Sequence, residues 1–258
     1  MTPNPLTLVL AAATAAALAL PAQAALNTGD IAFTAFNADE DGLSFVTLAD
    51  IDANTTVYFS DNEWTGSAFN TGESYTRWTS GSATVAAGTV VRLSAFDKTT
   101  LSASVGTLSR VTVSGSSNWG IASSNETVYA YLGSSATAPT TFLAAITNGS
   151  FAVDGGLTNT GLTEGSSNAI RLNALATTAT PDYAEYTGPR SGLASFAAYK
   201  TTLADLSHWT VDTSNGTYSA TVPNTTAFTV SSVPEPESYA LMLAGLAGLG
   251  FLTRRRRG

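Results

Sequence analysis

The stretch DIAFTAFNADEDGLSFVTLADIDANTTVYFSDNEW, from Asp30 to Trp64, decides the fold. Apolar and polar residues alternate in it over three short runs, a pattern that predicts β-strands, and the runs are Asp30–Phe36, Leu43–Leu48 and Thr55–Ser60. In the first run the alternation places Ile31, Phe33 and Ala35 on one face. Turn-forming residues fill residues 37–42 and 50–54, so we expect three strands joined by short turns.

Further runs of this kind follow, separated by residues that favour turns. They predict strands at Ser74–Thr79, Thr89–Ser94, Arg110–Val113, Thr127–Leu132, Thr141–Ile146, Ala169–Leu172 and Thr226–Val230. Ser191–Leu206 differs, because its apolar residues recur near helical spacing and predict one short helix. Regularly punctuated strands are typical of two packed sheets. We therefore predict that residues 25–232 form one all-β domain, an immunoglobulin-like antiparallel β-sandwich with one short helix.

The opening of this region resembles a known kind of module. Three segments are similar to the start of lamin-tail-like immunoglobulin β-sandwiches of bacterial extracellular proteins: GDIAFTAFNAD (Gly29–Asp39), FVTLADI (Phe45–Ile51) and TVYFSDNEW (Thr56–Trp64). Trp78 and the His208-Trp209 pair extend the resemblance more loosely. The resemblance implies a lamin-tail-like sandwich, and it transfers no catalytic residue, because sandwiches host many unrelated activities.

The charge of the chain limits its partners. The 258 residues include 19 acidic and 11 basic side chains, for a formal net charge of −8. Four of the basic residues are the terminal arginines, and two of the acidic ones are Glu235 and Glu237, so residues 25–232 hold seven basic and seventeen acidic side chains. A surface with this excess of negative charge repels phosphate backbones, so we expect no nucleic-acid partner. It attracts cations.

Two residue types are nearly or wholly missing. The chain has no cysteine, which excludes disulfides, thiol nucleophiles and cysteine-based zinc or iron–sulfur sites. It has one histidine, His208, which excludes a site built from several histidines. Stability must therefore come from burial of apolar and aromatic side chains.

The N-terminus has the features of a secretory signal peptide. Residues 6–20 read LTLVLAAATAAALAL, and Pro21 then precedes the small residues Ala22 and Ala24. An apolar segment followed by an A-x-A site is the pattern that signal peptidase cleaves. We predict a signal peptide over residues 1–24, passage through the Sec translocon, and cleavage after Ala24.

The C-terminus has the features of a membrane span with a fixed orientation. Residues 239–253 read YALMLAGLAGLGFLT and carry no charge, and the cluster Arg254, Arg255, Arg256 and Arg257 follows. Fifteen helical residues rise about 22 Å, which is short for a hydrocarbon core of about 30 Å. By the positive-inside rule the arginines stay in the cytoplasm, so everything N-terminal to the span lies outside. An ordinary single-span anchor is one interpretation of this segment.

The residues before the span favour another interpretation. Val233, Pro234, Glu235 and Pro236, then the apolar span and the arginine cluster, resemble the PEP-CTERM sorting signal of Gram-negative bacteria that make exopolysaccharide. The resemblance covers residues 233–258, and it implies processing by an exosortase that acts near the Pro-Glu-Pro motif. By this analogy the span is a transient inner-membrane anchor. The two prolines disfavour helix, so the motif is expected to be an extended peptide.

Two acidic turns are candidates for a metal site. Asp39, Glu40 and Asp41 lie in one predicted turn, and Asp61 and Glu63 lie in another. Calcium prefers several oxygen ligands from flexible loops, so a Ca²⁺ site is chemically reasonable. The spacing is not that of an EF-hand, and a solvated acidic surface is the alternative. No other cofactor is expected.

No catalytic residue is predicted. His208 and Asp205 lie near one another in the sequence, but a triad is defined by geometry, and no Gly-x-Ser-x-Gly elbow accompanies the pair. Trp64, Trp78 and Trp119 lie among Gly, Ser and Asn residues, where exposed rings can stack on sugars or buried rings can fill a core. A glycosidase mechanism requires a pair of carboxylates, and the sequence alone pairs no two of the seventeen acids. Asp61 and Glu63 would share a face if their turn continued the strand, but an Asx-type turn that closes the strand is favoured.

The sequence therefore favours a non-enzymatic protein of the cell surface or the extracellular matrix. It is expected to be exported, held transiently in the inner membrane, trimmed by an exosortase and released onto the exopolysaccharide layer. Two alternatives remain open: a secreted hydrolase acting on matrix polysaccharide, and a calcium-dependent carbohydrate-binding adhesin. A cleft with two facing carboxylates favours the hydrolase, and an acidic loop cluster with exposed tryptophan favours the adhesin.

Overall fold

A computed structural model describes residues 25–175, 180–214, 216–231 and 243–244. Two six-stranded sheets pack face to face, as the sequence predicts for a β-sandwich. The first contains, in spatial order, β12 (Trp209–Asp212), β11 (Tyr183–Tyr186), β1 (Ile31–Asn37), β2 (Gly42–Thr47), β5 (Val90–Ser94) and β6 (Ser102–Ala103). The second contains β10 (Ala169–Arg171), β9 (Ala138–Thr147), β8 (Thr127–Ser135), β3 (Thr56–Ser60), β4 (Tyr75–Thr79) and β7 (Thr107–Arg110). Neighbouring strands are antiparallel except β9 and β10, which are parallel.

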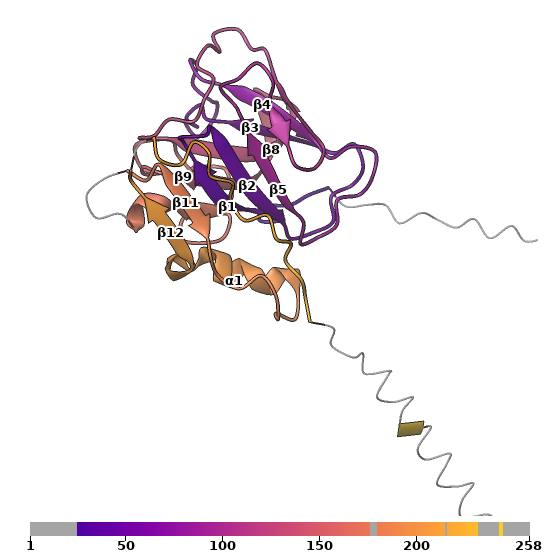
Figure 1. Cartoon of the computed structure of the whole chain (residues 1–258). Coiled ribbons are helices and arrows are strands. Elements are labelled where there is room, and N and C mark those ends of the chain that lie inside the picture. Colours follow the sequence, from indigo (N-terminus) through magenta and orange to yellow (C-terminus); the bar gives the residue numbers. More distant parts are fainter. Residues whose placement is uncertain (1–24, 176–179, 215, 232–242, 245–258) are drawn as a thin grey trace, which may run out of the picture.

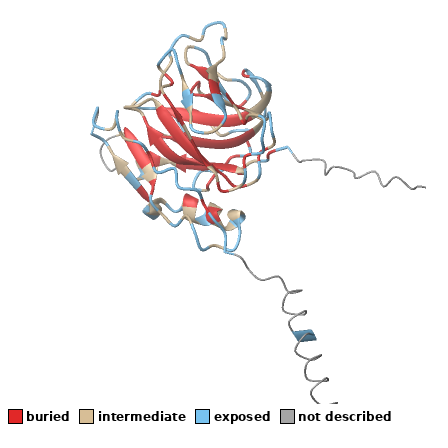
Figure 2. Cartoon of the chain, turned by 45° about the vertical axis from the view of Figure 1, so that its right-hand side comes forward, coloured by how far each residue is buried: buried red, intermediate tan, exposed pale blue. Residues whose placement is uncertain are grey.

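The core between the sheets is aromatic. Phe33 and Phe45 from the first sheet meet Phe59 and Trp78 from the second, and the ring centroids of Phe45 and Trp78 lie 5.5 Å apart. All four side chains are buried. Figure 2 shows the buried residues concentrated in the central strands. This packing replaces the disulfides that the chain lacks as the source of stability.

The outer face of the second sheet is covered as well. Tyr129, Tyr131 and Phe142 pack there under Trp64 and Phe69, both of which come from the loop between β3 and β4. The Trp64 indole donates a hydrogen bond to the backbone oxygen of Thr158 at 2.8 Å. Loops thus fold over this face and bury a second aromatic cluster, which explains why β8 is buried on both faces over Thr127–Tyr131.

The first strand departs from the simple alternation. Its register against β2 shifts between Phe33 and Ala35, so Thr34 forms a β-bulge. Because the bulge inserts one residue, Phe36 and not Ala35 joins Ile31 and Phe33 in the core between the sheets. The prediction that Ala35 shares a face with Ile31 and Phe33 is therefore wrong beyond the bulge. Alternation cannot show a bulge in a strand that is buried on both faces.

Most other predicted strands are confirmed within a few residues, with two exceptions. The strand predicted at Arg110–Val113 lies earlier, at Thr107–Arg110. Thr226–Val230 is no strand, and only Val230 makes an isolated bridge, to Leu193. The two-residue β6 and the four-residue β11 and β12 were not predicted, because they are too short for a periodic pattern.

The predicted helix at Ser191–Leu206 is shorter and composite. It consists of the 3-10 turn η2 (Phe196–Ala198), the helix α1 (Tyr199–Ala204) and the 3-10 turn η3 (Leu206–His208). A further 3-10 turn, η1, spans Leu172–Ala174. Helix α1 lies beside the first sheet, where Tyr199 and Leu203 are buried (Figure 1).

Candidate functional site

The first acidic turn, between β1 and β2, sends its three carboxylates in different directions. Asp39 accepts hydrogen bonds from the backbone N–H groups of Gly216 and Tyr218, at 2.7 and 2.9 Å. Glu40 forms a salt bridge with Arg92 on β5. Asp41, with φ of +55°, accepts a 2.7 Å bond from the N–H of Ile121. Each carboxylate thus fastens a different segment, so the turn is structural and not simply solvated.

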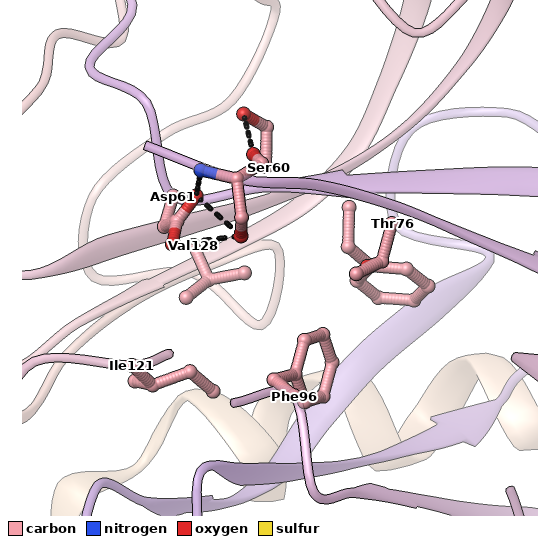
Figure 3. Close-up of a pocket in the computed structure, with 8 residues that line it drawn as sticks. Ser60, Asp61, Thr76, Phe96, Ile121 and Val128 are labelled. Atoms are coloured by element: carbon pink, nitrogen blue, oxygen red, sulfur yellow. Dashed lines mark hydrogen bonds between the residues drawn. The ribbon is translucent and has the colours of Figure 1, made fainter. Parts of the chain in front are cut away.

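In the second acidic turn, the side chain of Asp61 points into the interior of the domain. This side chain follows β3, is 4% exposed, and accepts hydrogen bonds from both the N–H and the hydroxyl of Ser74, at 2.7 and 2.9 Å. It borders a small cavity with Thr76, Phe96, Ile121 and Val128 (Figure 3). The cavity leaves about 10 Å³ for the centre of a water molecule. That space suits one water and excludes a substrate.

Two further carboxyl groups, which the sequence analysis did not single out, complete a buried acidic cluster around Asp61. Glu126 is 3% exposed and accepts a 2.9 Å hydrogen bond from the N–H of Ala122, and Glu73 is half-buried. Burial, reinforced by Glu73, raises the pKa of Asp61 to about 8. Burial, reinforced by Asp61, raises the pKa of Glu126 to about 9. Burial and the nearby Glu63 raise the pKa of Glu73 to about 7.

A further carboxyl group, that of Asp41, binds the same loop as Glu126, the loop between Trp119 and Glu126. Burial raises the pKa of Asp41 to about 6, and repulsion from the carboxyl group of Asp97 adds to the shift. Asp97 in turn pairs with Lys98. This loop is therefore held by Asp41, from the turn between β1 and β2, and by Glu126, which directly precedes β8. Sequence spacing carried no indication of this, because Asp41, Asp97 and Glu126 are far apart in the chain.

The structure does not gather the five predicted calcium ligands into one set. Asp39, Glu40 and Asp41 diverge, and among the described residues no group of three His, Cys, Asp or Glu side chains is arranged to hold a metal ion. Calcium binding by these turns stays a prediction. Its test is the melting temperature in millimolar CaCl₂ against EDTA, since a ligand that binds only the folded state raises it.

His208 and Asp205 are engaged separately. Asp205 caps the 3-10 turn η3 by accepting bonds from the N–H and hydroxyl of Ser207, at 2.9 and 2.7 Å. The Nδ1 atom of His208 lies 3.1 Å from the backbone oxygen of Thr202, and its ring meets Tyr186 edge-on. Among the described residues no carboxylate orients the imidazole as a triad requires, and the geometry matches a histidine at the end of a helical turn beside Trp209.

The tryptophans mainly fill the interior. Trp64 and Trp78 are 7% and 0% exposed, and each indole N–H bonds to a backbone oxygen. Trp119 is half-buried, and the guanidinium of Arg110 lies over its ring, 4.6 Å from the centroid. The ring face that contacts Arg110 is occupied, so Trp119 has at most one face for stacking on a sugar.

The last described segment before the tail is firmly docked. Phe228 is 2% exposed, stacks on Tyr186 at 5.8 Å and meets Tyr199 edge-on at 5.0 Å. Its N–H donates to the backbone oxygen of Gly88, and the N–H of Ser231 donates to that of Leu193, both at 2.8 Å. We call residues 226–231 the strap. It ties the end of the domain across the face that carries α1.

Only Ser232 separates the strap from the residues that the sequence analysis compared with a sorting signal. Residues 232–257 match the family model described as the PEP-CTERM protein-sorting motif. The chain carries a PEP-CTERM sorting motif. Such a motif implies export, cell-surface targeting and processing by an exosortase. The docked strap therefore lies directly before the PEP-CTERM motif in the sequence.

The other comparisons found no match, either among curated proteins or among solved structures. The lamin-tail-like resemblance accordingly stays a prediction. The signal peptide at residues 1–24 and nearly all of the tail, including Val233–Pro236 and the four arginines, lie outside the described residues. In the part of the chain that the structure does describe, no helix combines the length and the apolar character needed to cross a bilayer.

Proposed function

We propose that this chain is a non-enzymatic protein of the cell surface or extracellular matrix, with a structural or binding role on the exopolysaccharide layer. The Sec translocon exports it and signal peptidase cuts it after Ala24. The C-terminal span then holds it briefly in the inner membrane, until an exosortase processes it near Val233–Pro236. The β-sandwich is the part that persists and acts outside the cell.

The observation that carries this proposal is the PEP-CTERM motif at residues 232–257. The docked strap supports it, because Phe228–Ser231 is fastened to the domain directly before the motif. Cleavage at the motif would remove the apolar tail and leave the sandwich complete. An exported domain without cysteines, stabilised by two aromatic clusters, suits this route, since it folds without oxidation.

The buried acidic cluster gives the hydrolase alternative little support. Raised pKa values are typical of catalytic carboxyl groups, but Asp61 borders a cavity with room for one water. Glu126 is bound to the backbone of its own loop. Hydrolysis of a polymer needs carboxyl groups that face the substrate, so these groups are better explained as buried acids that hold loops together.

The test of the proposal separates recognition by the processing enzyme from membrane insertion. Glu235→Ala and Pro236→Ala leave the apolar span and the four arginines unchanged, so insertion and orientation should persist while processing fails. In cell fractionation we expect both variants to accumulate uncut in the inner membrane. Glu237→Ala, just outside the Val-Pro-Glu-Pro sequence, is the matched control and should be processed normally. Release of the Glu235 and Pro236 variants at the rate of the unmodified chain contradicts the proposal.

A further inference from the structure

A polar groove lies apart from the acidic cluster, between helix α1 and two loops. Its volume is about 390 Å³, within the range of small-ligand sites. No aromatic side chain lines it, and its walls are formed by Thr28, Gly29, Gly165, Ser166, Ser167, Asn168, Lys200, Thr201 and Ala204. We call it the Lys200 groove. None of the residues predicted from the sequence as site residues belongs to it.

The groove presents hydrogen-bond donors that the protein itself leaves unused. Ser167 is 5% exposed, yet its hydroxyl bonds to no described residue. The side-chain oxygen of Asn168 accepts from the N–H of Thr163 and the hydroxyl of Ser166, at 3.0 and 2.6 Å. Because a backbone N–H can only donate, these bonds fix the orientation of the amide. The NH₂ group of Asn168 is left with two donors and no described acceptor.

The charge of the groove is opposite to that of the rest of the domain. Of the seven basic side chains in the described residues, Arg92, Lys98 and Arg171 form salt bridges, and Arg110 and Arg190 lie over aromatic rings. Arg77 and Lys200 form neither kind of contact with a described residue, and of these two only Lys200 lines the groove. An unpaired ammonium group among unused donors attracts an anionic, acceptor-rich ligand.

Gly29 keeps the space beside this ammonium group open. Its φ is +80°, and a Cβ atom at this position would lie 3.4 Å from Nζ of Lys200 and 3.8 Å from Cβ of Asn168. The backbone at Gly29 is held by a 2.9 Å bond from its N–H to the oxygen of Leu143 on β9. Gly29 is thus fixed to β9 and lies close to both Lys200 and Asn168, as a preformed site requires.

We propose that the Lys200 groove binds an acidic sugar residue, with its carboxylate on Lys200 and its hydroxyls on Asn168 and Ser167. The hydroxyl-lined walls can both donate to and accept from the hydroxyls of a sugar, and the volume exceeds what a bare inorganic anion fills. The ligand is a uronate unit of an anionic polysaccharide. This inference rests on the proposed binding role outside the cell, but its test does not involve the sorting tail.

The experiment measures binding of tri-galacturonate to the full chain in a mild detergent, by calorimetry or by NMR shifts. The methyl ester of the same oligosaccharide tests the carboxylates, and inorganic phosphate tests whether any small anion suffices. We expect binding of the acid that weakens as salt rises, with at least about tenfold weaker binding of the ester. Binding of phosphate as tight as that of the acid, or no binding of the acid at millimolar concentration, overturns the proposal.

Variants locate the site on the groove. Lys200→Met keeps the aliphatic stem and removes the charge, so it should weaken binding of the acid by about tenfold. Arg77→Met is the matched control, because Arg77 is exposed on β4, outside the groove, and should bind normally. Ser167→Ala removes one hydroxyl and should weaken binding by a few-fold. Unchanged affinity in both Lys200→Met and Ser167→Ala rejects the groove as the site, and failure of exosortase processing would affect neither result.

Discussion

At Asp61 a carboxyl group follows a strand and turns into the interior, where Ser74 supplies all of its direct hydrogen bonds. Its place in an acidic turn was predictable from the sequence, and its burial was not. Burial depends on Thr76, Ile121 and Val128, which come from three different parts of the chain. Glu126 was missed for the same reason, since nothing in its local sequence distinguishes a buried acid from a solvated one.

The buried acids predict that the protein is less stable in alkali. The pKa values of about 8 for Asp61 and about 9 for Glu126 lie above their unfolded values. Between about pH 4 and these values the folded state binds more protons than the unfolded state, so the free energy of unfolding falls as pH rises. One pKa unit corresponds to about 1.4 kcal/mol, which is about 3–6 °C of melting temperature in a domain of this size. We expect the melting temperature to be at least about 5 °C lower at pH 8.5 than at pH 5.

Asp61→Asn tests the cause of this pH dependence. The amide stays neutral and can still accept from the N–H of Ser74, so the difference in melting temperature between pH 5 and pH 8.5 should become smaller. Glu164→Gln is the control, because Glu164 pairs with Arg171 at the surface, and it should keep the full difference. Equal pH dependence in Asp61→Asn and the unmodified protein contradicts the assignment to the buried cluster.

Among the elements, those with a long periodic pattern were predictable and those set by tertiary contacts were not. β2, β3 and β5 lie where alternation predicts them, within one residue at either end. β11 and β12 are four residues each, and pairing with one another and with β1 defines them. The strap was predicted as a strand, but its backbone bonds go to single residues, Gly88, Arg190 and Leu193, and not to one partner strand.

The strap is the last described segment before the sorting motif, and Gly88 is one of its closest contacts. Gly88 has φ of +88°, and a Cβ atom there would lie 2.2 Å from the backbone oxygen of Phe228 and 2.6 Å from the ring of Phe196. Gly88→Ala should therefore displace the strap. We expect faster amide exchange and faster proteolysis at residues 226–231.

Gly81→Ala is the matched control for this prediction. Gly81 has a similar φ of +91°, but nothing lies within 4 Å of a Cβ atom there. In both variants an alanine at positive φ strains the backbone by about 1 kcal/mol. Only in Gly88→Ala does the added Cβ atom also collide with the backbone oxygen of Phe228. If the rate of amide exchange at residues 226–231 is the same in both variants, contact with Gly88 does not hold the strap.

For the whole molecule, the sequence predicted the class of fold and the C-terminal sorting motif. Strand periodicity indicated a β-sandwich, and the order of Val-Pro-Glu-Pro, span and arginines indicated the PEP-CTERM motif that the family model matches. The Lys200 groove was not predictable, because its residues come from the chain near Gly29, the turn at Gly165–Asn168 and helix α1. Their proximity exists only in the folded domain.

The most direct test of the central claim is the mass of the C-terminal peptide of the protein recovered from outside the cells. We expect a chain that starts at Ala25 and ends at or next to Val233–Pro236, without the apolar residues 239–253 and without the four arginines. This end would show that the sandwich is released by cleavage at the PEP-CTERM motif. Recovery of the extracellular protein with its C-terminus intact at Gly258 would contradict processing by an exosortase.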